Sequence, residues 1–250
     1  MIYGPTSDIS AEEKDMLTEY VTGGGKLMVL AGPLKEGKLK NLYSLLEDYN
    51  VEVTDGIVVE SDRERYAFQA PYVLLPEILS SEITKPLIEE NYYTIMPIAQ
   101  GLKVRDTSGT VTEILTTSET AFSKIAGYDI SSYEKEDGDA DGPFALAVSV
   151  DCQNEGQIIW FTSSNLLDDM YNSYSSGANL DLGMNALSIL IGEREAVAIR
   201  SKSLSYHYLA ISESTASLLK IIMIGVFPLV FLGAGVYMII SRRRRQNEPV

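Results

Sequence analysis

Residues 23–31 read GGGKLMVLA, and this stretch decides the fold class of the chain. The three glycines end the helix expected before them, and the apolar run Lys26–Ala31 is typical of a strand that is buried on both faces. Ahead of the glycines, Ser10 and Glu13 have the spacing of a capping box, which predicts the start of that helix. Its apolar face is expected to carry Met16, Leu17, Tyr20 and Val21.

A second helix followed by a second strand is expected next in the chain. Gly32-Pro33 turns the chain, Asn50 ends the second helix, and 51–53 begins the next strand. The apolar face of that helix is predicted from Leu39, Leu42, Leu45, Leu46 and Tyr49. Alternation of helix and strand predicts an α/β fold with a doubly wound, mostly parallel sheet, and a further strand is expected just before Ile2.

The rest of the first 192 residues predicts the same α/β domain. Strands are expected at 92–98, 111–118, 144–150 and 157–163, a helical turn at 121–125, and a helix at 181–190. Residues 57–59 are expected to be extended, 62–82 to form an irregular loop over the sheet, and 133–142 a solvated acidic loop. We therefore assign residues 1–192 to one domain and 193–217 to a polar linker.

Residues 218–240 read LLKIIMIGVFPLVFLGAGVYMII, with Lys220 as the single charge. A helix of this length reaches about 35 Å, enough to cross a hydrocarbon core of about 30 Å. Lys220 can extend to the interface, and Pro228 is expected to kink the helix without ending it. This pattern predicts one C-terminal transmembrane helix.

Four arginines, Arg242, Arg243, Arg244 and Arg245, follow the span directly. Because basic clusters beside a span are usually retained in the cytoplasm, we expect 241–250 to be a cytoplasmic tail and the main domain to lie outside the cytoplasmic membrane. The start of the chain resembles no export signal, so we expect an upstream part that carried one. The alternative is a tail-anchored protein whose domain stays in the cytosol.

Composition excludes several classes of function. The formal net charge is −15, so nucleic acid is not an expected partner, because phosphate binding needs a basic face. The single cysteine, Cys152, excludes an internal disulfide, and the only histidine, His207, falls in the linker. Metal sites built from several histidines or cysteines are therefore excluded, and no cofactor is expected.

Two motifs match binding loops only in part. Residues 32–38 fit GxxxxGK between a strand and a helix, but Leu39 stands where a P-loop needs Ser or Thr, and Pro33 lacks an N–H donor. Residues 137–142, DGDADG, fit the first half of a calcium loop, but Val148 stands where a bidentate Glu is required. We interpret the first as an ordinary turn and leave weak calcium binding open.

No nucleophile elbow Gly-x-Ser/Cys-x-Gly is present, and no His stands near a nucleophile in sequence. Ligands of α/β folds bind outside the carboxyl ends of the strands. The candidate ligand crevice is therefore made of Gly32, Pro33, Ser163, Ser164, Asn165 and Asp168. Asp168 and the neighbouring Asp169 are also the carboxylates that a hydrolase would use, although capping of a helix is the simpler role for them.

Several segments together resemble the Gld-type, gliding-motility-like auxiliary component of ABC transporters. They are 4–5, 8–13, Tyr20, 23–30, 114–118, 142–148, 158–165 and 185–195, followed by the basic-ended span. The resemblance implies a flavodoxin-like, class I glutamine-amidotransferase-like domain without catalytic residues. It also implies an ABC permease and an ATP-binding subunit as partners. The N-terminal membrane segment usual in that family is missing from these 250 residues.

From these observations we expect a non-catalytic, membrane-anchored auxiliary subunit of an ABC-type export or motility complex. Two alternatives stay open. One is an extracytoplasmic receptor for a solute or glycan, and the other is a membrane-bound hydrolase that uses carboxylates.

Overall fold

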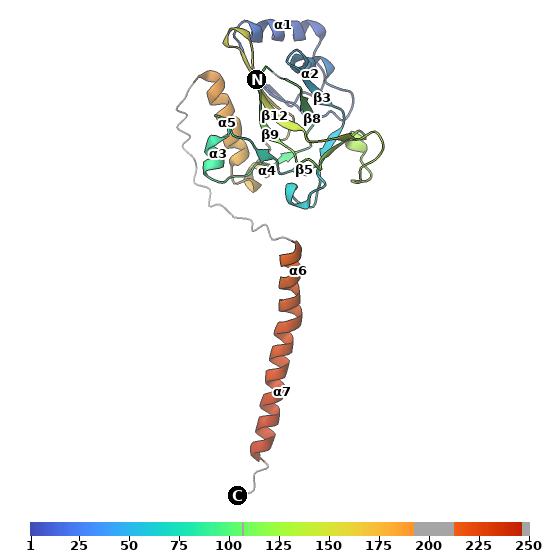
Figure 1. Ribbon diagram of the computed structural model, residues 1–250, viewed down its shortest axis with the longest axis vertical. Coiled ribbons are helices and arrows are strands. Elements are labelled where there is room, and N and C mark those ends of the chain that lie inside the picture. Colours follow the sequence, from blue (N-terminus) through green and yellow to red (C-terminus); the bar gives the residue numbers. More distant parts are fainter. Residues whose placement is uncertain (107, 193–212, 247–250) are drawn as a thin grey trace. The chain divides into compact units, whose positions relative to one another are not determined.

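The computed structural model describes residues 1–106, 108–192 and 213–246. The chain divides into two compact units, Met1–Ser205 and Tyr206–Val250, and each is described by itself. Figure 1 shows the first unit as a sheet with helices around it and the second as a long helix.

The central sheet contains eight strands and is mixed. They are β1 (Ile2–Tyr3), β2 (Lys26–Leu30), β3 (Val51–Thr54), β6 (Glu77–Ile78), β8 (Gly101–Val104), β9 (Val111–Thr116), β12 (Ala145–Asp151) and β13 (Gln157–Phe161). Its main path runs β1-β2-β13-β12-β8-β3, and β9 pairs with both β12 and β6. Parallel pairing joins β1 to β2 and β2 to β13, whereas the other pairings are antiparallel.

The expected mostly parallel sheet is therefore not what forms. A short connection of 3-10 helix η3 (Gln153–Glu155) joins β12 to β13 as an antiparallel hairpin, and such a pair needs no crossover helix. The strand expected just before Ile2 is formed by Ile2 and Tyr3 themselves. A doubly wound parallel arrangement is not confirmed.

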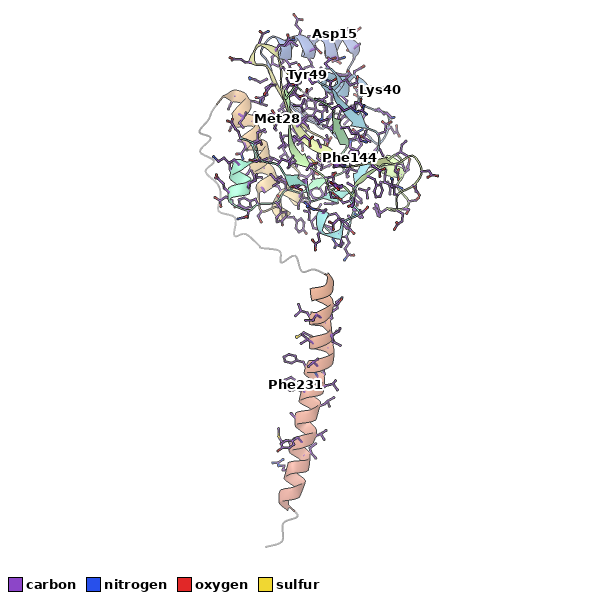
Figure 2. The ribbon with its side chains drawn as sticks, in the orientation of Figure 1. Asp15, Met28, Lys40, Tyr49, Phe144 and Phe231 are labelled. Carbon is purple, nitrogen blue, oxygen red and sulfur yellow. The ribbon has the colours of Figure 1, made fainter. Side chains whose placement is uncertain are left out.

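Two apolar cores cover the two faces of the sheet, because alternate residues of β2 point to opposite sides. Leu27 and Val29 belong to one core, which contains Leu42 and Leu46 of α2 (Lys40–Glu47). Met28 and Leu30 belong to the other, which is covered by α5 (Ala178–Ile191) and α3 (Lys85–Glu89). Figure 1 shows α1 and α2 together, away from α3 and α5, and Figure 2 shows Met28 and Phe144 inside the domain.

Side-chain caps mark where α1 and α2 begin, one supplied locally and the other by a distant residue. The capping box is confirmed at α1 (Ala11–Thr22): Glu13 N–H donates to Ser10 Oγ at 3.1 Å and Ser10 N–H donates to Glu13 Oε2 at 2.8 Å. Helix α2 has no side-chain cap of its own. Its first N–H groups, those of Asn41 and Leu42, donate instead to the carboxylate of Asp8 at 2.8 and 3.1 Å, so a distant residue caps it.

Two smaller sheets lie in the stretches whose structure the sequence predicted least well. One joins β4 (Ile57–Val59), β10 (Phe122–Lys124) and β11 (Ala140–Asp141), and the other joins β5 (Val73–Leu74) to β7 (Met96–Pro97). The predicted helical turn at 121–125 is therefore wrong, because pairing with distant strands overrides the local pattern. The strand expected at 92–98 is reduced to β7.

The remaining short elements lie in the connections between the strands and helices already described. They are the 3-10 turns η1 (Arg63–Arg65) and η2 (Gly127–Asp129), and the helix α4 (Asp169–Tyr174). The stretch 62–82, expected to be an irregular loop, contains η1, β5 and β6, and β6 belongs to the central sheet. The stretch 133–142, expected to be a solvated loop, contains β11 and the buried Asp139. The other predicted helices and strands of the domain agree with the structure to within a few residues.

The second unit is a continuous helix in three parts, α6 (Glu213–Ile221), the π-helical turn η4 (Ile222–Val226) and α7 (Phe227–Gln246). Among the described residues, Ser217–Ile239 is long and apolar enough to cross a membrane, with a mean hydropathy of 2.3 and none of its most apolar stretch buried. Figure 2 shows Phe231 projecting from this helix. The π-helical turn comes just before Pro228, where Phe227 N–H donates to Ile222 O, which relieves the clash a proline ring makes in a helix.

Candidate functional site

The carboxyl ends of the parallel strands β1, β2 and β13 meet at one edge of the sheet. Gly4 N–H donates to Leu30 O at 2.9 Å, and Ala31 N–H donates to Phe161 O at 3.0 Å, which continues the pairing past the strand ends. Gly32 N–H then donates to Ser164 Oγ at 2.9 Å. A Cβ at Gly32 would lie 3.1 Å from Ser164 N and 3.2 Å from Ile98 O, so the close approach of these loops favours glycine.

The polar groups of this edge bind one another. The hydroxyl of the fully buried Ser163 donates to Pro97 O and accepts from Asn165 N–H at 3.2 Å. Asn165 Nδ2 donates to Asp168 Oδ2 at 3.0 Å. The structure thus brings Gly32, Ser163, Ser164, Asn165 and Asp168 to one edge, where their hydrogen bonds define the shape of the loops.

Pro33 and the rest of the GxxxxGK segment take part in ordinary contacts. Tyr128 Oη donates to Pro33 O at 3.2 Å, and Lys38 Nζ lies 2.7 Å from Asp55 Oδ2 in an ion pair. Lys38 is the residue that a P-loop would aim at phosphate, and here its charge is matched by a carboxylate. This geometry supports the reading of the segment as a connecting turn.

Asp168 occupies the N-cap position of α4, but its side chain makes no capping hydrogen bond. Asp169 is the exposed first residue of that helix. The two carboxylates therefore differ in environment: one is half-buried and bound to an amide, and the other faces solvent. Nothing in this arrangement aligns them as an acid and base pair.

Tyrosines beside Asp168 were not selected from the sequence. Burial first, and then the negative charge of Asp168, raise the pKa of Tyr3, and burial, Tyr72 and Asp168 raise the pKa of Tyr171. The rings of Tyr72 and Tyr133 lie 5.9 Å apart. Tyr3 and Tyr171 are thus near enough to Asp168 to sense its charge, and Tyr72 lies beside Tyr133. The chain has 15 tyrosines, which was the available signal, but only the fold shows which of them gather.

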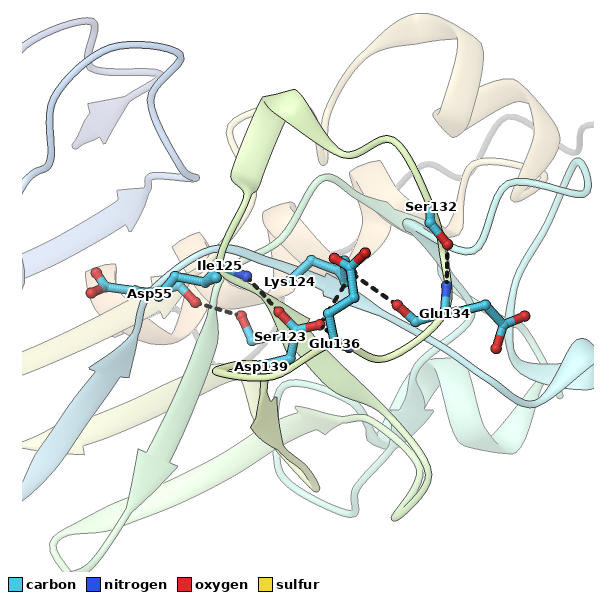
Figure 3. Close-up of polar contacts among 8 residues, drawn as sticks. All are labelled: Asp55, Ser123, Lys124, Ile125, Ser132, Glu134, Glu136 and Asp139. Carbon is cyan, nitrogen blue, oxygen red and sulfur yellow. Dashed lines mark hydrogen bonds and ion pairs between the residues drawn. The ribbon is translucent and has the colours of Figure 1, made fainter.

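A buried lysine binds the acidic loop at 137–142. Lys124, whose side chain is 1% exposed, lies on β10 with its ammonium 3.1 Å from Asp139 Oδ2 and in contact with Glu136 Oε2 and Glu134 O (Figure 3). Asp139 also accepts from the N–H groups of Ile125 at 3.0 Å and Glu136 at 2.9 Å. The ammonium of Lys124 supplies the positive charge that the calcium hypothesis assigned to a bound ion.

The same loop has no arrangement of three metal-ligating side chains. In the described parts of the chain, no group of three or more His, Cys, Asp or Glu residues is placed to hold a metal. Asp141 pairs with Lys135, so a second carboxylate of the motif is also engaged. In this loop Asp139 is therefore paired in the interior with Lys124, and Asp141 is paired on the surface with Lys135.

Glu60 is a second buried charged residue that sequence patterns did not single out. It is 2% exposed, and its carboxylate accepts from Ser118 N–H at 2.9 Å and from Ser118 Oγ at 2.7 Å. Burial raises the pKa of Glu60, and these hydrogen bonds oppose that rise. Glu60 directly follows β4 and Ser118 lies in the loop after β9, so these hydrogen bonds join the two segments.

Cys152 was also considered from the sequence, and its surroundings do not activate its thiol. Burial raises the pKa of the Cys152 thiol, the opposite of what a reactive cysteine needs. His207 lies outside the described residues. One surface cavity is lined by Glu47, Asn50, Glu52 and Arg105, away from the strand-end edge, and there Arg105 Nη2 lies 2.9 Å from Glu52 Oε2.

Comparisons with known proteins add a fold likeness. No family model matches this chain, and no curated protein matches it. A solved structure described as "mmIFT52 N-terminal domain" is similar, with 19% sequence identity and a TM-score of 0.54 over 75% of this chain and 74% of that one. At this identity the likeness shows the fold alone, a mixed sheet flanked by helices.

Proposed function

We propose that this chain is a membrane-anchored, non-catalytic auxiliary subunit of an ABC-type transport complex. One observation carries the proposal: a folded α/β domain is followed in the same chain by the apolar helix Ser217–Ile239, and none of the most apolar stretch of that helix is buried within the described residues. Such a helix needs lipid or partner helices around it, because exposed apolar surface of this extent is unfavourable in water.

The sidedness in this proposal comes from charge. Arg242–Arg245 directly follow the span, and basic residues at the end of a span favour the cytoplasmic side. The domain then works outside the cytoplasmic membrane, and the tail remains inside.

The assignment of a binding rather than catalytic role rests on the strand-end edge. Asp168 is bound to Asn165, and Ser163 is hydrogen-bonded to Pro97, so neither is set up as a nucleophile or a base. We further propose that the domain is a catalytically inactive relative of the class I glutamine-amidotransferase-like fold. The parallel strands β1, β2 and β13, with helices on both faces, support that kinship.

The permease and the ATP-binding subunit enter the proposal through the resemblance of the sequence to Gld-type components. The test is affinity purification of the tagged full-length chain from membranes in mild detergent, followed by mass spectrometry. Stoichiometric recovery of a polytopic permease and an ATP-binding subunit is the expected result. A chain that purifies alone, under conditions in which known ABC complexes stay intact, contradicts the partnership.

A receptor for a solute or glycan is the second candidate. Tyr3 and Tyr171, whose pKa values are raised in part by the charge of Asp168, favour it, because aromatic faces next to a polar group are common in sugar and small-molecule sites. Ligand-induced increases in the melting temperature, lost on substitution of Asp168 by Ala, would support this function in place of the first.

A further inference from the structure

Helix α5 carries a second apolar face that the described residues of the domain do not cover. Its exposed residues are Leu180, Met184, Leu187 and Ile191, with exposed fractions of 48, 49, 36 and 60%. We call this set the α5 seam. No exposed residue of α5 is polar, whereas an ordinary surface helix presents charged or polar residues to water.

The seam is straight and narrow. At about 100° per residue, the four side chains fall within an arc of roughly 60°. Their spacing of four, three and four residues is the alternation of d and a positions in two heptads, with Leu at both d positions and Met and Ile at the a positions. Such a line of apolar residues fits between the side chains of a second helix.

The seam belongs to a firmly held helix. On the opposite side of α5, Leu182, Ala186 and Leu190 pack into the core. The buried Asn179 donates from Nδ2 to Ile95 O and Leu166 O, both at 2.7 Å, and accepts from Ile95 N–H at 2.9 Å. The exposed apolar residues are thus a constant feature of the folded surface, available for a partner.

The charges around the seam select the partner. Helices α3 and α4 lie beside α5 (Figure 1), and Asn185 Nδ2 donates to Ile83 O just before α3. These neighbours and α5 itself contribute Glu89, Glu90, Asp169 and Asp181. Helix α3 also carries Lys85, whose ammonium lies 4.0 Å from the carboxylate of Glu89. The helices that border the seam, which we call its rim, thus carry a negative net charge, so a second copy of this chain would bring like charges together, and an anionic lipid surface would be repelled.

We propose that the α5 seam binds an amphipathic helix of another protein, one with an apolar stripe at heptad spacing and Lys or Arg along its flanks. The apolar stripe supplies affinity and the basic flanks supply orientation and specificity. The inference stands on α5 and its rim, and it does not depend on the partner being an ABC permease.

The probe is a synthetic, dye-labelled helical peptide of about three heptads with Leu at a and d and Lys at e and g. It is titrated against the purified full-length chain in phosphatidylcholine nanodiscs, and binding is followed by fluorescence anisotropy. One comparison peptide has Glu in place of Lys, and another keeps Lys but has Ser in place of Leu. We expect the first peptide to bind at least about tenfold more tightly than either of the others.

Substitutions in the protein locate the binding. The double variant Met184→Glu, Leu187→Glu is expected to weaken binding of the Lys peptide at least about tenfold, because charge enters the apolar seam. The control is Met16→Glu, which places a single glutamate on α1 at an apolar residue that is 69% exposed, and it should leave binding unchanged. Equal binding by the Ser peptide, no binding by any peptide, or binding that survives the double variant overturns the proposal.

A separate readout distinguishes other occupants. With Cys152→Ser as background, a polarity-sensitive dye on Met184→Cys is expected to shift to the blue only when the Lys peptide is added. A blue shift without peptide that grows with protein concentration assigns the seam to a second copy. One that is independent of concentration assigns it to lipid. Either result overturns the proposal and leaves the transporter partnership to its own copurification test.

Discussion

The ammonium of Lys124 lies 3.1 Å from Asp139 Oδ2, and the side chains of both residues are 1% exposed. The pair joins β10 to the acidic loop after it, and the same carboxylate accepts two backbone N–H groups (Figure 3). A buried ion pair that is broken on one side leaves an uncompensated charge in the interior. The loop that resembled a calcium site is thus organised by an internal lysine.

Asp139→Ala is therefore expected to lower the melting temperature of the domain by about 5 °C or more, since, among the described residues, it removes the only buried carboxylate that pairs with Lys124 and leaves the exposed Glu136 as its remaining ionic partner. Differential scanning calorimetry of the purified chain measures this. The matched control, Lys135→Met, breaks the exposed pair with Asp141 and should change the melting temperature by about 1 °C or less. An equal effect of the two substitutions contradicts the assigned role.

The same carboxylate predicts a loss of stability in acid. Burial disfavours ionisation of Asp139, but hydrogen bonds from Glu136 and Ile125 and the charge of Lys124 outweigh it and lower its pKa below 3.8. A lowered pKa adds stability that is present above the unfolded value and is lost as the pH falls through the folded value. Chemical unfolding of wild type and Asp139→Asn between pH 6 and pH 2.5 should show the difference in stability shrinking below about pH 4. If the difference in stability between the two proteins stayed the same across this pH range, the lowered pKa of Asp139 would be contradicted.

Glu60 is expected to give the opposite dependence of stability on pH from that of Asp139. Burial raises its pKa above 4.5, so the folded state holds the proton more tightly than the unfolded state does. Its contribution to stability is therefore largest in acid and is lost as the pH rises through the raised pKa. Relative to wild type, Glu60→Gln should become more stable as the pH increases from about 4.5 to 7, and urea unfolding at several pH values measures this. If the difference in stability between Glu60→Gln and wild type does not vary with pH, the raised pKa of Glu60 is contradicted.

An arginine at the middle of the apolar helix should weaken membrane insertion. Leu229→Arg lies near the centre of Ser217–Ile239, where a charged side chain costs about 2.5–3.5 kcal/mol on insertion scales. Met238→Arg, close to the end of the span, is the control, because its charge can reach the interface. Carbonate extraction of membranes should release more of the Leu229→Arg chain than of wild type or the control. Equal retention of all three would contradict a membrane-spanning role for this helix.

Local patterns predicted those parts of the fold that depend on neighbouring residues. The capping box of Ser10 and Glu13 is confirmed, and so is the apolar strand after Gly25, because both signals lie within a few residues. The strand at Phe122–Lys124 was missed, since its partners come from 57–59 and 140–141. The antiparallel pairing of β12 with β13 could have been predicted, because the six residues between the strands expected at 144–150 and 157–163 are too few for a crossover helix. The pairing of β3 with β8 and of β6 with β9 joins segments far apart in the sequence, which is why the rest of the mixed sheet was not predicted.

In the candidate crevice, too, some residues could be predicted from the sequence and others depend on the tertiary fold. The rule that ligands bind at strand ends selected Gly32 and Ser164, and the structure places them in hydrogen-bond contact. Binding of a ligand there stays a prediction. Tyr72 and Tyr171 were not selected, because they come from segments whose meeting depends on the tertiary fold. The buried roles of Lys124 and Glu60 were missed for the same reason, since a charged residue in a sequence is ordinarily assigned to the surface.

The orientation of the chain in the membrane tests the central claim most directly. In a Cys152→Ser background, a single cysteine replaces either Glu12, exposed on α1, or Asn247 in the tail, and intact cells are treated with a membrane-impermeant maleimide. The account predicts that the cysteine at 12 reacts in intact cells, whereas the cysteine at 247 reacts only after the membrane is opened. The reverse pattern would place the domain in the cytosol and contradict an extracytoplasmic subunit.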